Sequence, residues 1–262
     1  MINVVIFFLI IVNLFLIFLL NKKKIKGFFY KNKIQTVDLN ELNDIFLNKQ
    51  IDKNLLGPKE EVIVKSFCID KNNKIVGMTS DYEAWIISSL SKISNKIFEF
   101  GTCSGKTTYL MALNSSDDTQ ITTITLKPEN LNDIEKQFLD NKTSFRNIIN
   151  ESIYEKFLFS GTKYENKIDV IFQNSLTFDE KKFNNKFDLI FIDGGHTYSI
   201  VKNDSEKSFR MLRKNGIILW HDFVPGKESA KNVVKYINNI SSRKKIFHIK
   251  NTSLCYYKNN LE

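Results

Sequence analysis

Short apolar runs and longer amphipathic stretches alternate along most of this 262-residue chain. Continuous apolar runs predict strands that are buried on both faces, and a period near 3.6 residues predicts helices. The expected strands are residues 96–100, 121–126, 168–173, 188–193 and 216–221; the expected helices are residues 106–114, 129–139, 199–213 and 228–240. This alternation is typical of an α/β fold with a doubly wound, mostly parallel sheet and helices on both faces.

Both ends of this pattern carry additional signals. Ser80-Asp81-Tyr82-Glu83 matches a capping box, so another helix is expected to begin there. Residues 246–250 and 253–257 flank the dipeptide Asn251-Thr252 and predict a C-terminal antiparallel hairpin. The hairpin brings the expected sheet to seven strands.

Residues 2–20 contain no charged residue and are apolar apart from Asn3 and Asn13. Nineteen helical residues span roughly 28 Å, about the thickness of the hydrocarbon core of a bilayer. A cleaved signal peptide would need a basic start and a small-residue cleavage site, which this run lacks. A buried core helix is the other alternative, but it would normally show a polar face. The run therefore predicts a transmembrane helix.

The formal charge of +9 is concentrated just after this run. Six of the charges come from Lys22, Lys23, Lys24, Lys26, Lys31 and Lys33. Because these lysines follow the apolar run, the positive-inside rule places the rest of the chain on the cytoplasmic side. The same lysines can contact anionic lipid headgroups. The remaining +3 forms no basic stripe, which argues against nucleic-acid binding.

These signals divide the chain into three parts. We expect a transmembrane anchor at residues 1–21, a basic juxtamembrane tether and N-terminal extension at 22–76, and a globular domain at 77–262. The three cysteines, Cys68, Cys103 and Cys255, cannot all pair with one another and match no zinc-binding spacing. Their number and spacing favour a reducing compartment.

Two predicted strands, about ninety residues apart, end in an acid and a glycine. The first segment is Phe98-Glu99-Phe100-Gly101, and the second is Phe191-Ile192-Asp193-Gly194. In open α/β sheets, ligands bind in the crevice outside the carboxyl ends of the strands. The two segments therefore predict one small-molecule site.

The segment Gly101–Thr107 resembles a phosphate-binding loop but differs from it. A P-loop has four residues between its glycines, whereas three separate Gly101 from Gly105, and Cys103 replaces the second glycine of the dinucleotide fingerprint. Glycines let the backbone pass close to a ligand, and the amides of a helix start, with Thr107, can bind a carboxylate. With Glu99 for an ammonium, the loop suits an amino-acid zwitterion. The alternative is a tight turn that simply needs glycine.

These motifs together resemble class I S-adenosylmethionine-dependent methyltransferases, in the branch of small-molecule and sugar O-methyltransferases. The resemblance covers residues 77–258 and rests on Glu99-Phe-Gly-Thr-x-x-Gly-x-Thr107 and Asp193-Gly-Gly-His-Thr-Tyr198. It extends to Gly77-Met-Thr-Ser80, Asn174-Ser-Leu-Thr-Phe-Asp179 and Gly216-Ile-Ile-Leu-Trp-His-Asp222. It implies a Rossmann-like fold and methyl transfer from S-adenosylmethionine.

The resemblance also implies residues that bind the cofactor. Those expected to hold its methionine part are Glu99, Gly101, Thr102, Gly105 and Thr107, and those near its adenine are Asn174 and Ser175. The family expects an acid for the ribose hydroxyls near the end of the second strand, where this chain has Thr125. Glu129 lies nearby, but it equally fits the role of an acid at a helix start.

A catalytic group is implied at Asp193, His196, His221 and Asp222. In metal-dependent relatives, carboxylates at the positions of Asp193 and Asp222 hold Mg²⁺ or a similar ion, which polarises the acceptor hydroxyl. The family's usual ligand after the second acid is replaced by Phe223. Either histidine could instead act as the general base, or could merely brace the strand ends.

The leading interpretation is an enzyme that methylates an oxygen of a small-molecule, sugar or glycan acceptor at the cytoplasmic face of a membrane. One alternative is a membrane-anchored scaffold that binds the cofactor without catalysis, as the loss of the ribose acid at Thr125 would suggest. The other is a nucleotide-dependent phosphotransferase, which the short glycine loop disfavours. The acceptor and the oligomeric state are left open by the sequence.

Overall fold

The computed structural model of the chain describes residues 79–129 and 151–259 without interruption. It also describes shorter stretches, at residues 11–13, 15, 17, 33–38, 41, 48–52, 55–58, 62–65, 68–69, 75–77, 146, 148 and 149.

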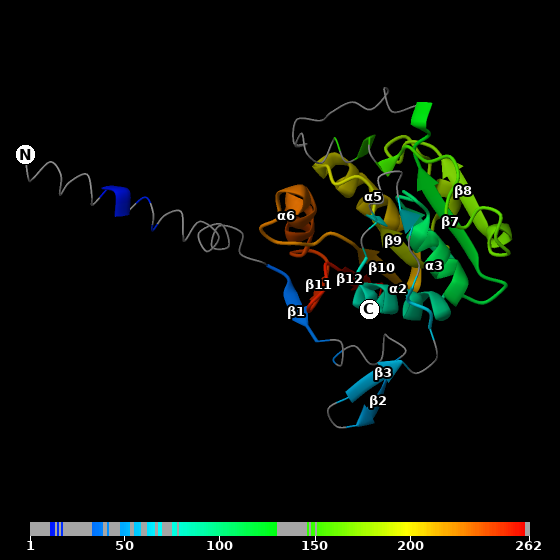
Figure 1. The fold of residues 1–262 in the computed structure, drawn as a ribbon, viewed down its shortest axis with the longest axis horizontal. Coiled ribbons are helices and arrows are strands. Elements are labelled where there is room, and N and C mark those ends of the chain that lie inside the picture. The colour runs from blue at the N-terminus through cyan, green and yellow to red at the C-terminus, as the bar shows by residue number, and fades with distance from the viewer. Residues whose placement is uncertain are drawn as a thin grey trace, which may run out of the picture.

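The described domain is built on an eight-stranded sheet with the strand order β1-β11-β12-β10-β9-β6-β7-β8 (Figure 1). Its strands are β1 (Gln35–Val37), β6 (Lys96–Phe100), β7 (Gln120–Thr125), β8 (Ile168–Phe172), β9 (Phe187–Ile192), β10 (Leu212–Trp220), β11 (Phe247–Ile249) and β12 (Cys255–Lys258). Two small antiparallel pairs lie apart from it, β2 (Asn48–Asp52) with β3 (Leu55–Pro58) and β4 (Cys68–Ile69) with β5 (Ile75–Val76).

The predicted α/β fold with a mostly parallel sheet is confirmed. The pairs β6–β7, β7–β8, β6–β9 and β9–β10 are all parallel. The predicted C-terminal hairpin is also present, because β11 pairs with β12 in the antiparallel sense. Its second strand, β12, lies between β11 and β10 and is antiparallel to both, so the hairpin completes the sheet.

The sheet has eight strands, and the prediction of seven was one too few. The extra strand is β1, which lies in the segment assigned to the tether and pairs in parallel with β11 (Gln35 with Phe247). Ile34 and Val37 are 5% and 4% exposed, so their burial against the sheet holds β1 in place. A strand of three residues is too short to show the alternation that identifies strands in a sequence.

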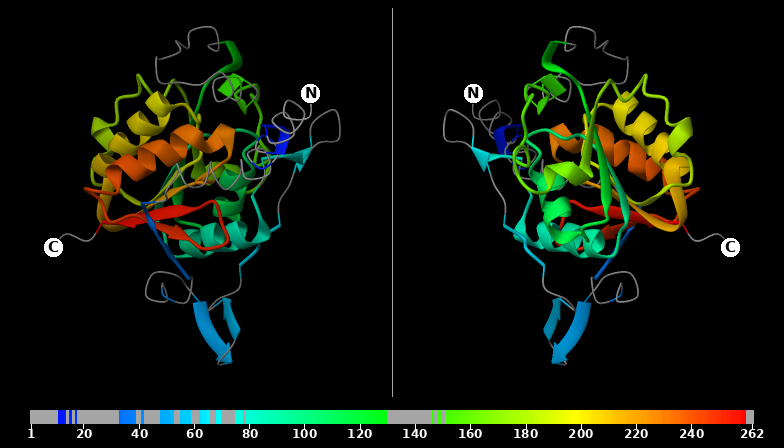
Figure 2. Two further views of the ribbon diagram at one scale, coloured as in Figure 1. Left: turned by 90° about the vertical axis from the view of Figure 1, so that its left-hand side faces the viewer. Right: turned by 90° about the vertical axis from the view of Figure 1, so that its right-hand side faces the viewer.

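Two layers of helices cover the two faces of the sheet (Figure 2). Helices α2 (Asp81–Lys92) and α3 (Lys106–Asn114) lie on one face, and α5 (Tyr198–Met211) and α6 (Lys231–Ile240) lie on the other. Short 3₁₀ helices, η3 (Glu165–Lys167), η4 (Lys181–Phe183) and η5 (Glu228–Ala230), lie in the connections. The predicted capping box is present: the Ser80 hydroxyl accepts from Glu83 N, and Glu83 accepts from Ser80 N.

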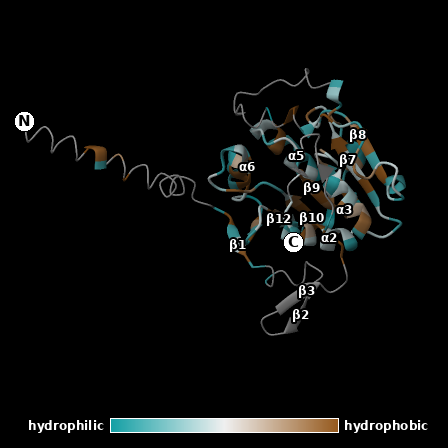
Figure 3. Ribbon diagram, in the orientation of Figure 1, coloured by the Kyte–Doolittle hydropathy of each residue, from teal (hydrophilic) through white to brown (hydrophobic). Residues whose placement is uncertain are grey.

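Each helical layer buries one apolar cluster against the sheet. Ile86, Leu90 and Met111 pack with the β6–β7 face of the sheet, whereas Val201, Val233 and Ile237 pack on the opposite face. The strands in the middle of the sheet are therefore buried on both faces, as every residue of β9 is. Figure 3 colours each residue of the sheet by its hydropathy. Continuous apolar runs in the sequence have this physical origin.

Among the described residues, no helix is both long and apolar enough to cross a membrane. The predicted anchor at residues 2–20 lies outside the described residues, apart from positions 11–13, 15 and 17. The helix predicted at residues 129–139 likewise lies outside them, apart from Glu129.

Candidate active site

The loop after β6 adopts a backbone conformation that its glycines make possible. Gly101 has φ of 99° and Gly105, the residue before α3, has φ of 75°. A Cβ on Gly101 would lie 2.3 Å from the carbonyl oxygen of Asp193, and one on Gly105 would lie 2.6 Å from Cβ of Phe157. Both glycines are thus required by neighbouring parts of the protein, as the tight-turn alternative expects, and their contact with a ligand stays a prediction.

Glu99 lies beneath this loop and is fully buried. Its carboxylate accepts hydrogen bonds from the hydroxyls of Thr108 and Thr123, the latter at 2.7 Å, and Thr123 also pairs with the hydroxyl of Thr102. Burial raises the pKa of Glu99 to about 8 despite these hydrogen bonds. Glu99 Oε2 and Thr102 therefore belong to an internal polar network, whereas Glu99 Oε1 is buried without a hydrogen-bond partner among the described residues. The contact of Glu99 with a ligand ammonium stays a prediction.

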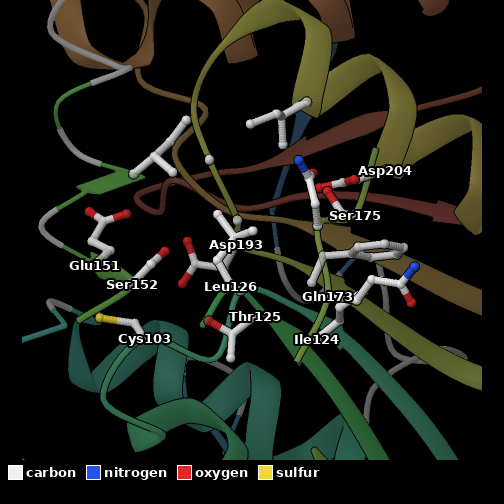
Figure 4. A pocket seen from close by; sticks show the side chains of 17 residues that line it. Cys103, Ile124, Thr125, Leu126, Glu151, Ser152, Gln173, Ser175, Asp193 and Asp204 are labelled. Carbon is white, nitrogen blue, oxygen red and sulfur yellow. The ribbon is translucent and has the colours of Figure 1, made fainter. Parts of the chain in front are cut away.

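A cavity opens at the carboxyl ends of the strands (Figure 4). Four of the residues predicted for the cofactor or for catalysis line it: Gly101, Asn174, Ser175 and Asp193. Residues that the sequence interpretation did not single out as ligands also line it, among them Cys103, Glu151, Ser152, Gln173, Gly195, Ile200 and Asp204. Glu99, Thr102, Gly105 and Thr107 are not among the lining residues.

Thr125 lies at the strand end where the family's ribose-binding acid was expected. Thr125 ends β7 and lines the cavity, so the usual acid is absent at that point of the wall. Glu129 does not replace it, because its side chain is 72% exposed and lies 3.4 Å from Lys127 Nζ. The sugar hydroxyls of a bound cofactor would therefore meet Thr125 and neighbouring groups such as Gln173.

Helix α5 contributes two buried charged residues behind the turn that follows β8. Asp204 is fully buried, and burial raises its pKa to about 6 against the opposing hydrogen bonds of Ser175 and Asn203. Lys207 is 6% exposed, and its ammonium donates to the carbonyl oxygens of Ser175 and Phe178. The pair thus fixes the backbone around the predicted adenine position.

The four predicted catalytic residues converge. Asp193 follows β9 and Asp222 follows β10, and these strands are parallel neighbours. His196 Nε2 lies 2.9 Å from Asp222 Oδ2, and His221 Nδ1 lies 3.2 Å from both Asp193 Oδ1 and Asp222 Oδ2. Asp222 has φ of 60°, an αL conformation that turns its carboxylate toward both histidines.

These contacts shift the ionisation of the cluster. Burial favours neutral His196, but the hydrogen bond and charge of Asp222, with the charges of Glu151 and Asp193, outweigh it and raise the pKa of His196 to about 9. The pKa of His221 is raised well above its ordinary value, because Asp193 and Asp222 likewise outweigh the effect of burial. The two imidazoles lower the pKa of Asp222 in return, although burial opposes this change.

Glu151 was not predicted to belong to this cluster. It lines the cavity on the same side as Asp193 in Figure 4. Burial raises its pKa to about 7, with the charges of Asp193 and Asp222 adding to the effect and that of His196 opposing it. It lies next to the undescribed part of the chain, and no sequence motif marks it.

Asp193, His196 and Asp222 are also the group of described residues that could hold a metal ion. Each offers one ligand atom, and the three atoms lie within 4.8 Å of one another. Phe223 supplies nothing to this group, since it is 1% exposed and packs 5.3 Å from the ring of His248. Two carboxylates and one imidazole are ligands that Mg²⁺, Mn²⁺ or Zn²⁺ accept.

A second, larger cavity of about 610 Å³ lies beside the same cluster. His221 and Asp222 form part of its wall, together with the starts of α2 and α3. The cluster predicted to be catalytic therefore borders two cavities, one at the strand ends near Asn174 and Ser175 and one near Lys106.

Comparisons with known proteins agree with this geometry. Residues 98–223 match the model of a family described as a methyltransferase domain. A candidate caffeoyl-CoA O-methyltransferase from Staphylococcus aureus has a similar fold, with a TM-score of 0.50, 19% identity, and coverage of 71% of this chain and 86% of that one. No curated protein sequence matches the chain significantly.

Two further solved structures are similar. Cofactor-bound Rv0187 from MTB has a TM-score of 0.50 and 11% identity, with 71% of this chain and 83% of that one covered. The methyltransferase PaMTH1 from Podospora anserina, bound to SAH, has a TM-score of 0.49 and 16% identity, with 71% and 80% covered. At 19% and 11% identity, the likeness to the structures from Staphylococcus aureus and MTB shows a shared fold.

Proposed function

We propose that this chain, a class I S-adenosylmethionine-dependent methyltransferase, moves the methyl group of the cofactor to an oxygen of a small-molecule, sugar or glycan acceptor. The observation that carries the proposal is the cluster of Asp193, His196 and Asp222 between two cavities. An O–CH₃ bond forms as the S–CH₃ bond breaks, and the acceptor's hydroxyl proton must leave. The chain supplies carboxylates and imidazoles at the place where that proton would be released.

The cavity lined by Asn174 and Ser175 is the proposed cofactor site. Its volume in this structure is about 60 Å³, well below the roughly 300–1,000 Å³ of ordinary ligand pockets. Binding therefore requires the wall to move. We assign that movement to the wall at Glu151 and Ser152, which lie opposite Ser175 in Figure 4.

Proton removal is assigned to one of the two histidines. His221 lines the larger cavity, where the acceptor would lie, whereas His196 lies between Asp222 and Glu151. Either imidazole must be neutral to accept a proton, and the surrounding carboxylates favour its charged form. The carboxylates that favour the charged imidazole also orient it and stabilise the imidazolium that forms once it has taken the proton.

A divalent cation fits the same residues. Asp193, His196 and Asp222 would hold it, and Mg²⁺ or a similar ion would polarise the acceptor hydroxyl when bound. Chelator treatment followed by readdition of Mg²⁺ or Mn²⁺ tests this part of the proposal. Lost and restored turnover would support the cation, whereas full activity in chelator would leave the histidine as a metal-free base.

Calorimetric titration with S-adenosylhomocysteine and with ATP tests the central proposal. We expect S-adenosylhomocysteine to bind and ATP not to bind, because the glycine loop has one residue too few for a P-loop. A screen of metabolite and glycan extracts with a labelled methyl donor then seeks the acceptor. Binding of the cofactor without methyl transfer to any acceptor would favour the scaffold alternative.

We also propose that residues 2–20 anchor the protein in a membrane with the catalytic domain on the cytoplasmic side. The uncharged run and the lysines after it support this proposal. The described side chains of Ile11, Phe15 and Ile17 are 48%, 59% and 54% exposed, which argues against a helix buried in the domain core. Recovery of the full-length protein in the soluble fraction after lysis would refute it; retention in a salt-washed membrane pellet would support it.

A further inference from the structure

Three lysines from separate segments line the larger cavity. Lys65 precedes β4, Lys106 begins α3, and Lys227 follows β10. Lys65 is exposed, and the side chain of Lys227 is 55% exposed. Lys106 is only 9% exposed, and its ammonium donates to the carbonyl oxygen of Gly77 at 3.1 Å, which fixes it in the cavity wall.

The carboxylates of the same cavity are mostly engaged by other groups. Glu83 accepts hydrogen bonds from Ser80 and from the amide and hydroxyl of Ser253, and lies 3.8 Å from His221 Nε2. Asp222 lies within 3.2 Å of both histidines. Asp81 is exposed at the start of α2. Lys227 Nζ lies 3.9 Å from Asp222 Oδ1 as well. With Glu83 and the pair of Asp222 and Lys227 set aside, Lys65 and Lys106 outnumber Asp81, and the cavity favours anions.

We infer that the acceptor carries an anionic group, a phosphate or a carboxylate, that Lys106, Lys227 and Lys65 bind in this cavity while its hydroxyl faces Asp222 and His221. The inference rests on the proposed methyl transfer and adds to it the chemical class of the acceptor. Lysine ammonium groups bind phosphate and carboxylate as point charges, and a partly buried cation gains most from such a partner.

Lys106 has a second significance, because it belongs to the Gly-Lys-Thr sequence that resembles a P-loop. In the structure, it lines the larger cavity, on the acceptor side of Asp222, rather than the strand-end cavity proposed for the cofactor. The lysine of the resembling motif is thus assigned to the acceptor, and no nucleotide is needed to account for it.

The test measures binding of matched probes to the full-length protein in detergent, saturated with S-adenosylhomocysteine. Glucose phosphate is compared with glucose, and gallate with pyrogallol, so that each pair differs by one anionic group. We expect the anionic member of at least one pair to bind about tenfold tighter, and added salt to reduce the difference. Preference for glucose phosphate would identify phosphate, and preference for gallate would identify carboxylate.

Variants connect the preference to the lysines. Lys106→Met and Lys227→Met should each reduce the preference about tenfold, and Lys227→Arg should retain it. Lys231→Met is the matched control, since Lys231 is an exposed lysine of α6 beside Glu228. Unchanged S-adenosylhomocysteine affinity in each variant verifies that it is folded, and Lys227→Met serves if Lys106→Met fails to fold.

Three results would overturn the inference, and they are distinguishable. Equal binding of charged and neutral probes, with S-adenosylhomocysteine bound normally, would refute the anionic acceptor alone. Failure of the parent protein to bind S-adenosylhomocysteine would refute the proposed function, and the inference with it. A preference that survives both methionine substitutions would place the anion elsewhere and equally refute the assignment.

Discussion

The ends of β6 and β9 are alike in sequence, but their acidic residues occupy different environments. The two strands are parallel neighbours, and each brings an acid and a glycine to its carboxyl end. Glu99 aligns with Phe191, and Phe100 with Ile192, so Glu99 lies one residue inside the end of its strand. Asp193 comes after the last residue of β9. A difference of two positions along the register puts one carboxyl in the core and the other at the cavity.

The comparison shows that an acid can line a ligand site only where it lies beyond the end of its strand and its side chain reaches the cavity. Glu99 is surrounded by Thr108 and Thr123 and stabilises the interior beneath the loop. Asp193 reaches His221 and lines the strand-end cavity. Gly101 is required because the backbone of Asp193 lies against it. The glycine after β6 therefore makes room for the residue that follows β9.

Replacing Gly101 should have the largest effect. Gly101→Ala places a Cβ 2.3 Å from the Asp193 carbonyl oxygen at φ of 99°, and we expect the free energy of unfolding to fall by about 3 kcal/mol or more. Gly161→Ala is the control, since Gly161 has φ of 74° but nothing within 4 Å of the added Cβ. It should cost only about 1 kcal/mol. Equal urea midpoints for the two variants would contradict the packing role.

Asp222→Asn should affect catalysis rather than folding. Asparagine is well tolerated in the αL conformation that Asp222 adopts, so the backbone should persist. Loss of the charge between His196 and His221 should lower turnover about a hundredfold, while S-adenosylhomocysteine affinity changes less than about twofold. Asp169→Asn, on an exposed position of β8, is the control. Parent-like turnover in Asp222→Asn would remove the cluster from the mechanism.

Thr125→Asp tests the ribose site at the end of β7, the other neighbour of β6 in the sheet. If the ribose site lacks only its acid, the substitution should tighten S-adenosylhomocysteine binding about tenfold, because a carboxylate accepts both sugar hydroxyls. Thr125→Asn should give a smaller gain, since it has the shape without the charge. Titration of both variants measures the difference, and weaker binding in Thr125→Asp would mean that the ribose is held by other groups.

Glu99→Gln should have the smallest effect on cofactor binding, within about twofold, because the parent side chain is largely protonated at neutral pH and faces away from the cavity. Its effect should appear in the pH dependence of stability. The folded-state pKa of about 8 lies above the unfolded value, so the folded state retains the proton longer, and the parent loses stability as pH rises from about 4.5 to about 8.

Glu99→Gln should remove that slope. Urea denaturation at intervals between pH 5 and pH 9 measures it, and the two proteins should differ most in their pH dependence below about pH 8. Identical slopes would show that Glu99 ionises normally. A large loss of S-adenosylhomocysteine affinity would instead return Glu99 to the cofactor site.

The helices and the longer strands were predictable because their buried residues recur without interruption along the sequence. Residues 96–100 and 106–114 were predicted with the bounds that β6 and α3 have in the structure. Strand β10 begins at Leu212, four residues before the prediction, because a bulge containing Asn215 at φ of 63° precedes its apolar run. Polar residues in a bulge interrupt the pattern by which strands are recognised.

The candidate catalytic cluster was predictable because its members directly follow buried strands or lie within four residues of their ends. Glu151 and Asp204 were missed for different reasons. Glu151 belongs to no motif and approaches Asp193 only through tertiary structure. Asp204 and Lys207 had a usable signal, since both lie on the face of α5 that also carries Val201 and Met211. A charged residue on a buried helical face indicates a paired or functional group.

The edge strand β1 sets a limit on distance. Because Gln35–Val37 is fixed to β11, a chain anchored through residues 2–20 has only residues 21–34 between the bilayer and the sheet. Fourteen fully extended residues reach at most about 50 Å. Strand β1 would then stay within about 50 Å of the membrane surface, and the domain fixed to it would work on acceptors that are concentrated at that surface.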